Sequence, residues 1–274
     1  MGYFVYRRTR NVGLMLVGVA LVWLLVRAQE RRLESSAFTT GYVLLAGVLF
    51  LALYNVRKKL PFLPLGSSAG WLQWHLYVGA GSIGVFALHA GTWWPNGMLE
   101  AALALLYLLT VSSGVLGLYL TRTIPAQLAR VGDEFIYERI PAIRRQVGTQ
   151  AGDVVLQAVA ASGATTLADF YTGRVYDFFH RSRGVRYLLL PTTAQRRALM
   201  RAMRDTRRYL SDPEQRACER LFALVRRKDD LDFSEARQKL LKLWLFGHIG
   251  LTYALVLTAL LHAVLAHAFA GGAA

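Results

Sequence analysis

The sequence predicts an all-α, polytopic membrane protein: a five-helix transmembrane bundle with a mainly helical cytoplasmic insertion between helices four and five. Three observations support this prediction. Of the 274 residues, 54% are hydrophobic, which exceeds the usual share in soluble domains. Long uncharged runs lie near both ends of the chain, as membrane helices require. The 32 Lys and Arg residues, against 17 Asp and Glu, gather in the middle of the chain and beside these runs.

Four apolar runs in residues 1–120 predict the first four transmembrane helices. About 20 apolar residues cross the hydrocarbon core as a helix, and flanking basic side chains that reach the interface extend a shorter run. The third run begins at Trp71 and Trp74, whose rings suit the headgroup zone. The predicted helices cover residues 12–26, 38–56, 71–91 and 98–120.

Residues 121–241 are predicted to form an arginine-rich insertion, because no run in this stretch is both apolar and long enough to span a bilayer. Two short segments within it, 133–140 and 185–190, fit a strand or a helix equally well. Residues 242–274 then contain the fifth transmembrane helix, over 243–270, and a short tail.

Three start signals predict helices within the insertion. Thr192 with Gln195 fits a capping box, and Asp212, which a proline follows, begins a second helix. A third signal, Asp232 or Ser234, opens a helix that continues without a break into the fifth span. We expect the second helix to end before the third begins.

The distribution of positive charge predicts the orientation. Cytoplasmic segments of membrane proteins carry an excess of Lys and Arg. The N-terminal segment, the triplet 57–59 and the insertion are basic, whereas residues 92–99 and the tail after 268 contain neither Lys nor Arg. We therefore expect a multi-pass protein of the inner (plasma) membrane with a cytoplasmic N-terminus and its C-terminus outside. This topology explains the net charge of +15, so nucleic acid is not an expected partner.

Two of the apolar helices each carry a pair of histidines with the same spacing. His75 and His89 lie fourteen residues apart in the third helix, as do His248 and His262 in the fifth. Fourteen residues return a helix to within about 40° of its starting direction and advance it by about 21 Å. Both helices run from inside to outside, so His75 should lie level with His248. By the same argument, His89 should lie level with His262.

Pairs of imidazoles at two depths predict two haem b groups. Polar side chains in hydrocarbon need partners, and a haem between two helices with one histidine from each is six-coordinate and suited to electron transfer. The inner haem would be held by His75 and His248. The outer haem would be held by His89 and His262. Zinc is less natural because closed zinc sites want four ligands, and Cys218, the only cysteine, excludes a CxxCH haem attachment.

Glycines in the same helices suit the close approach of a macrocycle. Gly79, Gly81 and Gly84 lie between the two histidines of the third helix, and Gly250 follows His248. Close packing of membrane helices explains such glycines equally well, so both interpretations stay open. Helix four offers further small residues that would let a helix or a flat ligand approach: Ser112, Ser113, Gly114 and Gly117.

His267 stands apart from the two pairs. Five residues after His262, it points about 140° away around the helix. A hydrogen-bonded residue at the interface is the favoured interpretation, and a role near an outer quinol site is the alternative.

These residues resemble the superfamily of di-haem membrane b-type cytochromes, in which two helices each carry His-x13-His or a close variant. Ligands on helices three and five are most similar to the transmembrane domain of ferric reductases and NADPH oxidases; respiratory cytochrome b carries the spacing on helices two and four. The resemblance covers the five spans but not the insertion. We expect no flavin or nicotinamide domain of the ferric reductase type in this sequence, since it contains no GxGxxG or P-loop motif.

The resemblance implies a cytochrome subunit of a membrane oxidoreductase complex, which carries electrons across the membrane between quinone or quinol and a redox partner subunit. The expected partners are membrane lipid, other subunits of that complex and quinone. The arginines of the insertion suit an acidic partner surface or anionic headgroups, or simply obey the positive-inside rule. A haem-free transporter subunit with proton-relay histidines and a membrane anchor remain as alternatives.

Overall fold

The computed structural model describes residues 2–33, 35–59, 66–91, 97–131 and 135–270. Within these ranges every element is helical and no strand occurs, so the predicted all-α class is confirmed. The chain divides into two compact units. Unit 1 comprises Met1–Leu116 and Phe246–Ala274, and unit 2 comprises Gly117–Leu245.

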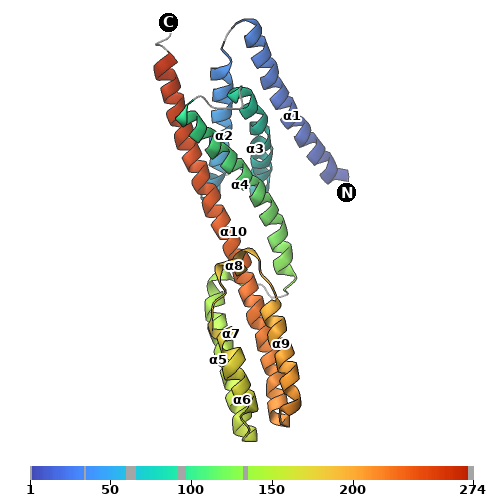
Figure 1. Cartoon of the computed structure of the whole chain (residues 1–274). Helices are drawn as coiled ribbons and strands as arrows, with labels where there is room; N and C mark the ends of the chain where they lie inside the picture. Colours follow the sequence, from blue (N-terminus) through green and yellow to red (C-terminus); the bar gives the residue numbers. More distant parts are fainter. Residues whose placement is uncertain (1, 34, 60–65, 92–96, 132–134, 271–274) are drawn as a thin grey trace. The chain divides into compact units, whose positions relative to one another are not determined.

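Unit 1 contains three whole helices and parts of two longer ones that continue into unit 2. Four of the helices in the described residues, α1, α2, α4 and α10, are long and apolar enough to cross a membrane. They indicate a multi-pass membrane protein whose apolar helices contact lipid. The helices are α1 Gly2–Arg31, α2 Ala37–Lys59, α3 Ser68–Ala90, α4 Met98–Ala129 and α10 Asp212–Ala270 (Figure 1).

Helix α3 is not among the four apolar helices, so the predicted five spans are supported for only four. Its 23 residues include two histidines, a glutamine and four glycines, which lower its mean hydropathy. The helix begins at Ser67, whose side chain accepts a hydrogen bond from the Gly70 N–H, and it ends at Gly91 with a φ of 60°. It packs against α2 and α1. The histidines and glycines predicted as site residues of α3 are thus among the residues that lower its mean hydropathy.

Contacts on two sides position α3 within unit 1. A Cβ atom at Gly84 would lie only 2.9 Å from Cγ1 of Val19, so the absence of a side chain lets α1 approach closely. On another side, the Ser82 and Tyr107 hydroxyls share a buried hydrogen bond of 2.9 Å that joins α3 to α4. The histidines of α3 are therefore carried on a helix with well-defined neighbours.

Unit 2 is a bundle of shorter helices packed against the first part of α10. Fully buried apolar side chains from α5, α6, α9 and α10 meet in its core, among them Ile140, Leu167, Met203 and Leu221. Its elements are η1 Tyr137–Arg139, α5 Ile140–Ser162, α6 Thr166–Phe170, η2 Tyr171–Val175, α7 Tyr176–His180, α8 Val185–Leu189, α9 Ala194–Thr206 and η3 Arg207–Tyr209. Of the two segments that fit a strand or a helix, residues 137–140 and 185–189 are helical, whereas residues 135, 136 and 190 belong to neither a helix nor a strand; residues 133 and 134 lie outside the described residues.

The structure moves two of the predicted helix caps. Helix α9 has Thr193, not Thr192, at its N-cap, and no side-chain cap hydrogen bond forms there. Helix α10 follows Ser211, whose backbone N–H and hydroxyl donate to the Glu214 carboxylate at 3.0 and 2.9 Å. The same carboxylate accepts from the Leu167 N–H at 2.9 Å and so ties α10 to the start of α6. The capping box is therefore Ser-x-x-Glu, one residue earlier than expected.

Helix α10 runs unbroken from Asp212 to Ala270, so the separate start predicted at Asp232 or Ser234 is wrong. Both side chains are buried within unit 2. Asp232 accepts a hydrogen bond from Lys228, one turn earlier, at 2.5 Å. Residue types that favour caps are used here inside a helix, where a buried partner satisfies the carboxylate.

A cluster of buried charges joins α10 to α5 and to the loop between α7 and α8. The fully buried carboxylate of Asp232 lies 2.5 Å from Lys228, 2.9 Å from Arg183 and 3.5 Å from Arg144. Arg183 also pairs with Asp229 at 2.7 Å. Burial lowers the pKa of Lys228 and raises the pKa of Asp229. We call these five residues the charge cluster.

Tyr187 lies beside the charge cluster and should ionise late. Burial, followed by the negative charge of Asp229, raises the pKa of Tyr187 to about 12. Because this pKa lies above the ordinary value of about 10, the neutral phenol contributes stability that is complete below pH ~10 and is lost as the pH rises further. In an ultraviolet titration of tyrosinate, Tyr187→Phe should remove a component that titrates near pH 12. The control Tyr209→Phe, at an exposed position, should leave that component in place.

Candidate functional site

The four histidines of α3 and α10 face each other in two pairs within unit 1. The ring centroids of His75 and His248 are 6.3 Å apart, and their planes meet at 72°. The rings of His89 and His262 are 6.4 Å apart, at 85°. All four side chains are half-buried. The structure therefore brings together the same partners that the helix geometry predicts.

The separation of the rings suits a single metal ion between the members of each pair. An imidazole nitrogen lies about 1.1 Å from its ring centroid and forms metal bonds of about 2.0–2.1 Å, so two rings on opposite sides of one metal have centroids about 6.3 Å apart. A direct edge-to-face contact falls anywhere in about 4.5–7 Å. The two histidine pairs have nearly the same centroid separation although they lie fourteen residues apart along the helices. This similarity favours the same kind of ligand between the rings of each pair.

A hydroxyl group from α2 sets the orientation of His89. Nδ1 of His89 lies 3.0 Å from the Thr40 hydroxyl oxygen. The same hydroxyl lies 3.0 Å from the Ser36 carbonyl oxygen and 3.1 Å from that of Ala37, so it can donate to the backbone while it accepts from an Nδ1–H of His89. With its proton on Nδ1, the neutral ring would present the lone pair of Nε2 to a metal.

The inner pair has a similar support from α4. Nδ1 of His248 lies 3.2 Å from the Ser113 hydroxyl oxygen, which again leaves Nε2 directed elsewhere. The ring of Tyr54, on α2, contacts the ring of His75 with centroids 5.2 Å apart. Each pair thus has at least one neighbour, on α2 or α4, that positions an imidazole.

Two glycines lie beside the histidines: Gly41, which is not among the predicted site residues, and Gly114, one of the small residues of helix four expected to allow a close approach. A Cβ atom at Gly41 would lie 3.0 Å from Cε1 of His89, and one at Gly114 would lie 3.7 Å from Cε1 of His248. At Gly79, Gly81 and Gly84 the nearest atoms belong instead to Leu51, Met15 and Val19 of α2 and α1, and Gly250 has nothing within 4 Å. For the three α3 glycines, close helix packing is the interpretation that the contacts favour.

Thr40 and Gly41 were missed because neither residue type signals a ligand site alone. The available signal was their combination, since a hydroxyl and a glycine stand side by side within the apolar run of α2. Gly117, singled out for close approach, does accommodate a large neighbour: its Cβ would lie 1.8 Å from the Trp244 ring.

His267 is bonded away from the outer pair. Its Nε2 lies 2.5 Å from the Tyr42 hydroxyl, and its Nδ1 lies 2.8 Å from the Ala263 carbonyl oxygen. The ring also contacts Phe38 edge-on at 5.1 Å. Both nitrogens thus have partners within unit 1, as expected of a hydrogen-bonded residue at an interface.

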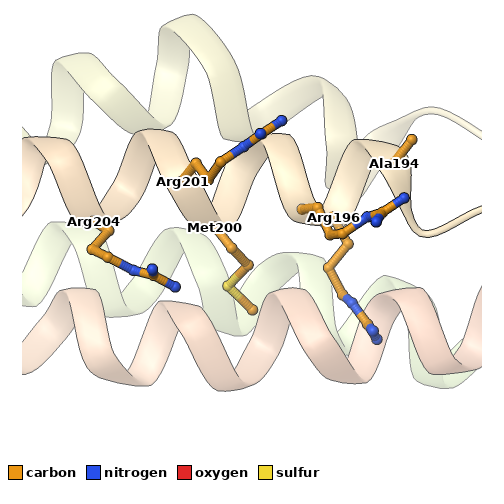
Figure 2. Close-up of a pocket in the computed structure, with 6 residues that line it drawn as sticks. Ala194, Arg196, Met200, Arg201 and Arg204 are labelled. Carbon is orange, nitrogen blue, oxygen red and sulfur yellow. The ribbon is translucent and has the colours of Figure 1, made fainter.

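The arginines of the insertion line a concavity of about 440 Å³ on α9 in unit 2. Figure 2 shows Met200 between Arg196 and Arg204, with Arg201 extending to the other side of the helix. Arg196 is engaged by Asp229 at 3.3 Å and Asp230 at 3.5 Å, whereas Arg201 and Arg204 are exposed. The concavity is therefore only partly neutralised by the protein itself.

Comparison with known proteins adds no relative from which a function could be transferred. No family model matches the sequence, and no curated protein or solved structure is significantly similar to it. Among the described residues, no group of three or more His, Cys, Asp or Glu side chains that could hold a metal ion is found. The two histidine pairs, with ring centroids 6.3 and 6.4 Å apart, are the feature of unit 1 that bears on function.

Proposed function

We propose that the protein is a di-haem b cytochrome subunit of a membrane oxidoreductase complex. His75 and His248 would hold the inner haem, and His89 and His262 the outer haem. The observation that carries the proposal is the nearly equal separation of the two ring pairs, 6.3 and 6.4 Å, at the value that two axial imidazoles need. Bound in this way, haem would supply one-electron chemistry.

The side chains around the pairs have defined tasks in this proposal. Thr40 holds His89 in the tautomer that presents Nε2, and Ser113 orients His248. Gly41 and Gly114 leave room beside the two rings. The fourteen-residue spacing separates the two levels by about 21 Å along the helices, so the sites lie near opposite faces of a membrane about 30 Å thick.

The proposed topology has five spans in the inner membrane: the four apolar helices α1, α2, α4 and α10, and α3 in addition. What supports it is the packing of α3 against α1 and α2, two helices apolar enough to span. The positive charge near the N-terminus and in the insertion supports a cytoplasmic N-terminus and a C-terminus outside. In this arrangement electrons pass between quinone or quinol and a redox partner subunit on opposite sides of the membrane.

Absorption spectroscopy tests the proposal directly. The purified full chain, reduced with dithionite, should show a b-type α band, and haem extraction should yield two haems per chain. A colourless protein would contradict the proposal and favour a haem-free transporter subunit. The observation behind that second candidate is the Thr40–His89 and Ser113–His248 hydrogen bonds, which also suit a proton relay.

Gly41→Ala should disturb the outer haem alone. The added methyl group would lie 3.0 Å from Cε1 of His89, so the ring must shift by a few tenths of an ångström. We expect a changed midpoint potential for one haem and an unchanged potential for the other, measured by redox titration. Gly79→Ala is the matched control, because its Cβ would meet only Leu51 at 4.0 Å. Equal effects of the two substitutions would contradict this assignment.

A further inference from the structure

A cavity of about 530 Å³ lies among α1, α2 and α3, apart from the histidine pairs. Its volume falls within the range of about 300–1,000 Å³ that is usual for ligand sites. Apolar side chains of all three helices line most of it, among them Leu14, Val43 and Val78. Charged and amide side chains line it only near the start of α1 and α3, while Tyr77 and Ser82 add hydroxyl groups farther along α3. The cavity is therefore amphipathic along its length.

The polar end of the cavity is positively charged. It is lined by Arg7, Arg10, Asn11 and Gln73, and no Asp or Glu is among the described residues that line the cavity. The Arg7 guanidinium donates to the Gln73 side-chain oxygen at 3.1 Å, and the Arg10 guanidinium donates to the Asn11 side-chain oxygen at 3.4 Å. The two amides thus steady two guanidinium groups that stand one turn apart on the same helix.

Helix α1 provides the long wall of the cavity. Residues 7, 11, 14, 18 and 22 recur at intervals of three and four and so form one stripe of the helix. Gly18 in this stripe has nothing within 4 Å of where a Cβ would stand, so the space beside it is open. Figure 1 shows α1 joined to α2 at one end and diverging from it toward the N-terminus, the end at which the arginines lie.

The length of the apolar wall matches one leaflet of a bilayer. From residue 10 to residue 22 the helix rises by about 18 Å, and half of a hydrocarbon core is about 15 Å deep. A ligand that fills this wall has an extended apolar chain. A ligand that satisfies two guanidinium groups carries a negative charge, since a phosphate accepts strong, charge-assisted hydrogen bonds from arginine.

We propose that this cavity binds an anionic phospholipid. Arg7 and Arg10 contact the phosphate, Asn11 and Gln73 contact the polar region beside it, and one acyl chain lies along α1 between α2 and α3. A quinone would suit the apolar wall, but its neutral carbonyls accept weaker hydrogen bonds from guanidinium groups than a phosphate does. The site is independent of haem and would exist whether or not the histidine pairs bind iron.

Native mass spectrometry of the full-length, delipidated protein in detergent tests the proposal. Dioleoylphosphatidylglycerol, dioleoylphosphatidylcholine and decyl-ubiquinone are added separately. Both lipids carry a phosphate, but the quaternary ammonium of phosphatidylcholine offsets its charge within the headgroup. We expect the phosphatidylglycerol to be retained at least about tenfold better, because a net charge-assisted contact is worth about one order of magnitude. Equal retention of the two lipids, or binding of decyl-ubiquinone without phosphatidylglycerol, would overturn the proposal.

Two matched pairs of variants separate this site from general surface charge and lipid contact. Arg10→Gln should weaken phosphatidylglycerol retention about tenfold, whereas Arg8→Gln, which removes the same charge from a residue outside the cavity, should not. Gly18→Leu should fill the cavity and reduce retention, whereas Gly13→Leu, also in open space but outside the cavity, should not. The same result within either pair would show that the cavity is not the binding site.

Discussion

Replacing His248 by Ala in the full chain should leave a protein that binds one haem instead of two. On the proposed function, a haem b without its second axial imidazole has lost half of its protein ligation. His75→Ala should remove the same haem, because the two rings face each other at 6.3 Å. His89→Ala and His262→Ala should both remove the other haem. The measurements are the haem-to-protein ratio and a redox titration, in which a single midpoint potential remains.

The pairing is what the four variants decide. His267→Ala serves as the control and should keep both haems, because its ring nitrogens are bonded to Tyr42 and Ala263. If a variant loses both haems through misassembly, His248→Gly is the alternative. Free imidazole can occupy the place of the missing side chain in this variant, so its addition should recover the inner haem. The haem that remains should have the same midpoint potential in His75→Ala and in His248→Ala. Different potentials would show that these two residues do not share an iron, and would contradict the proposal.

The histidine pairs could be predicted from the sequence because their positions depend only on helix geometry. Once the two apolar runs are helices, a spacing of fourteen residues fixes the face and the depth of each imidazole. The direction of the two helices then decides which histidines lie level. None of these steps requires knowledge of side-chain packing, and the structure places each histidine opposite the expected partner.

The residues that support the histidines depend on packing and could not be predicted in the same way. Thr40 and Gly41 reach His89 only because α2 lies against α3, and their combination within an apolar run does not indicate which helix they contact. The unbroken course of α10 was missed for a related reason. Asp232 and Ser234 resemble cap residues in the sequence, but in unit 2 both side chains are buried inside a continuous helix.

Asp232→Asn should destabilise unit 2 by about 3–5 kcal/mol, because removing one partner of a buried ion pair leaves an uncompensated charge. The carboxylate is fully buried and contacts Lys228, Arg183 and Arg144. Cys218 reports the effect: it is the only cysteine of the chain, it lies buried in unit 2, and burial raises the pKa of its thiol. Alkylation of Cys218 under native conditions should become more than about a hundredfold faster as opening becomes easier.

The control and the rescue distinguish lost charge compensation from lost packing. Glu219→Gln removes a carboxylate that pairs with Arg207 at the surface, so it should change stability by less than about 1 kcal/mol. Arg183 and Arg144 keep Asp229 and Glu235 as partners, so Lys228 is the cation left without a carboxylate in Asp232→Asn. Adding Lys228→Met should therefore recover most of the lost stability.

The pH dependence of Asp232→Asn provides an independent check on the same cause. Burial already lowers the pKa of Lys228, and loss of Asp232 removes the largest charge that opposes this effect. When the pKa of a lysine is lower in the folded protein than its unfolded value of about 10.4, the folded protein releases the proton first. The free energy of unfolding therefore increases as the pH rises from the folded-state pKa to the unfolded-state pKa. The deficit of Asp232→Asn should thus shrink toward alkaline pH, provided that it is measured below the range in which Tyr187 ionises. A deficit that stays constant across this range would mean that the lost stability comes from packing, not from an unpaired Lys228.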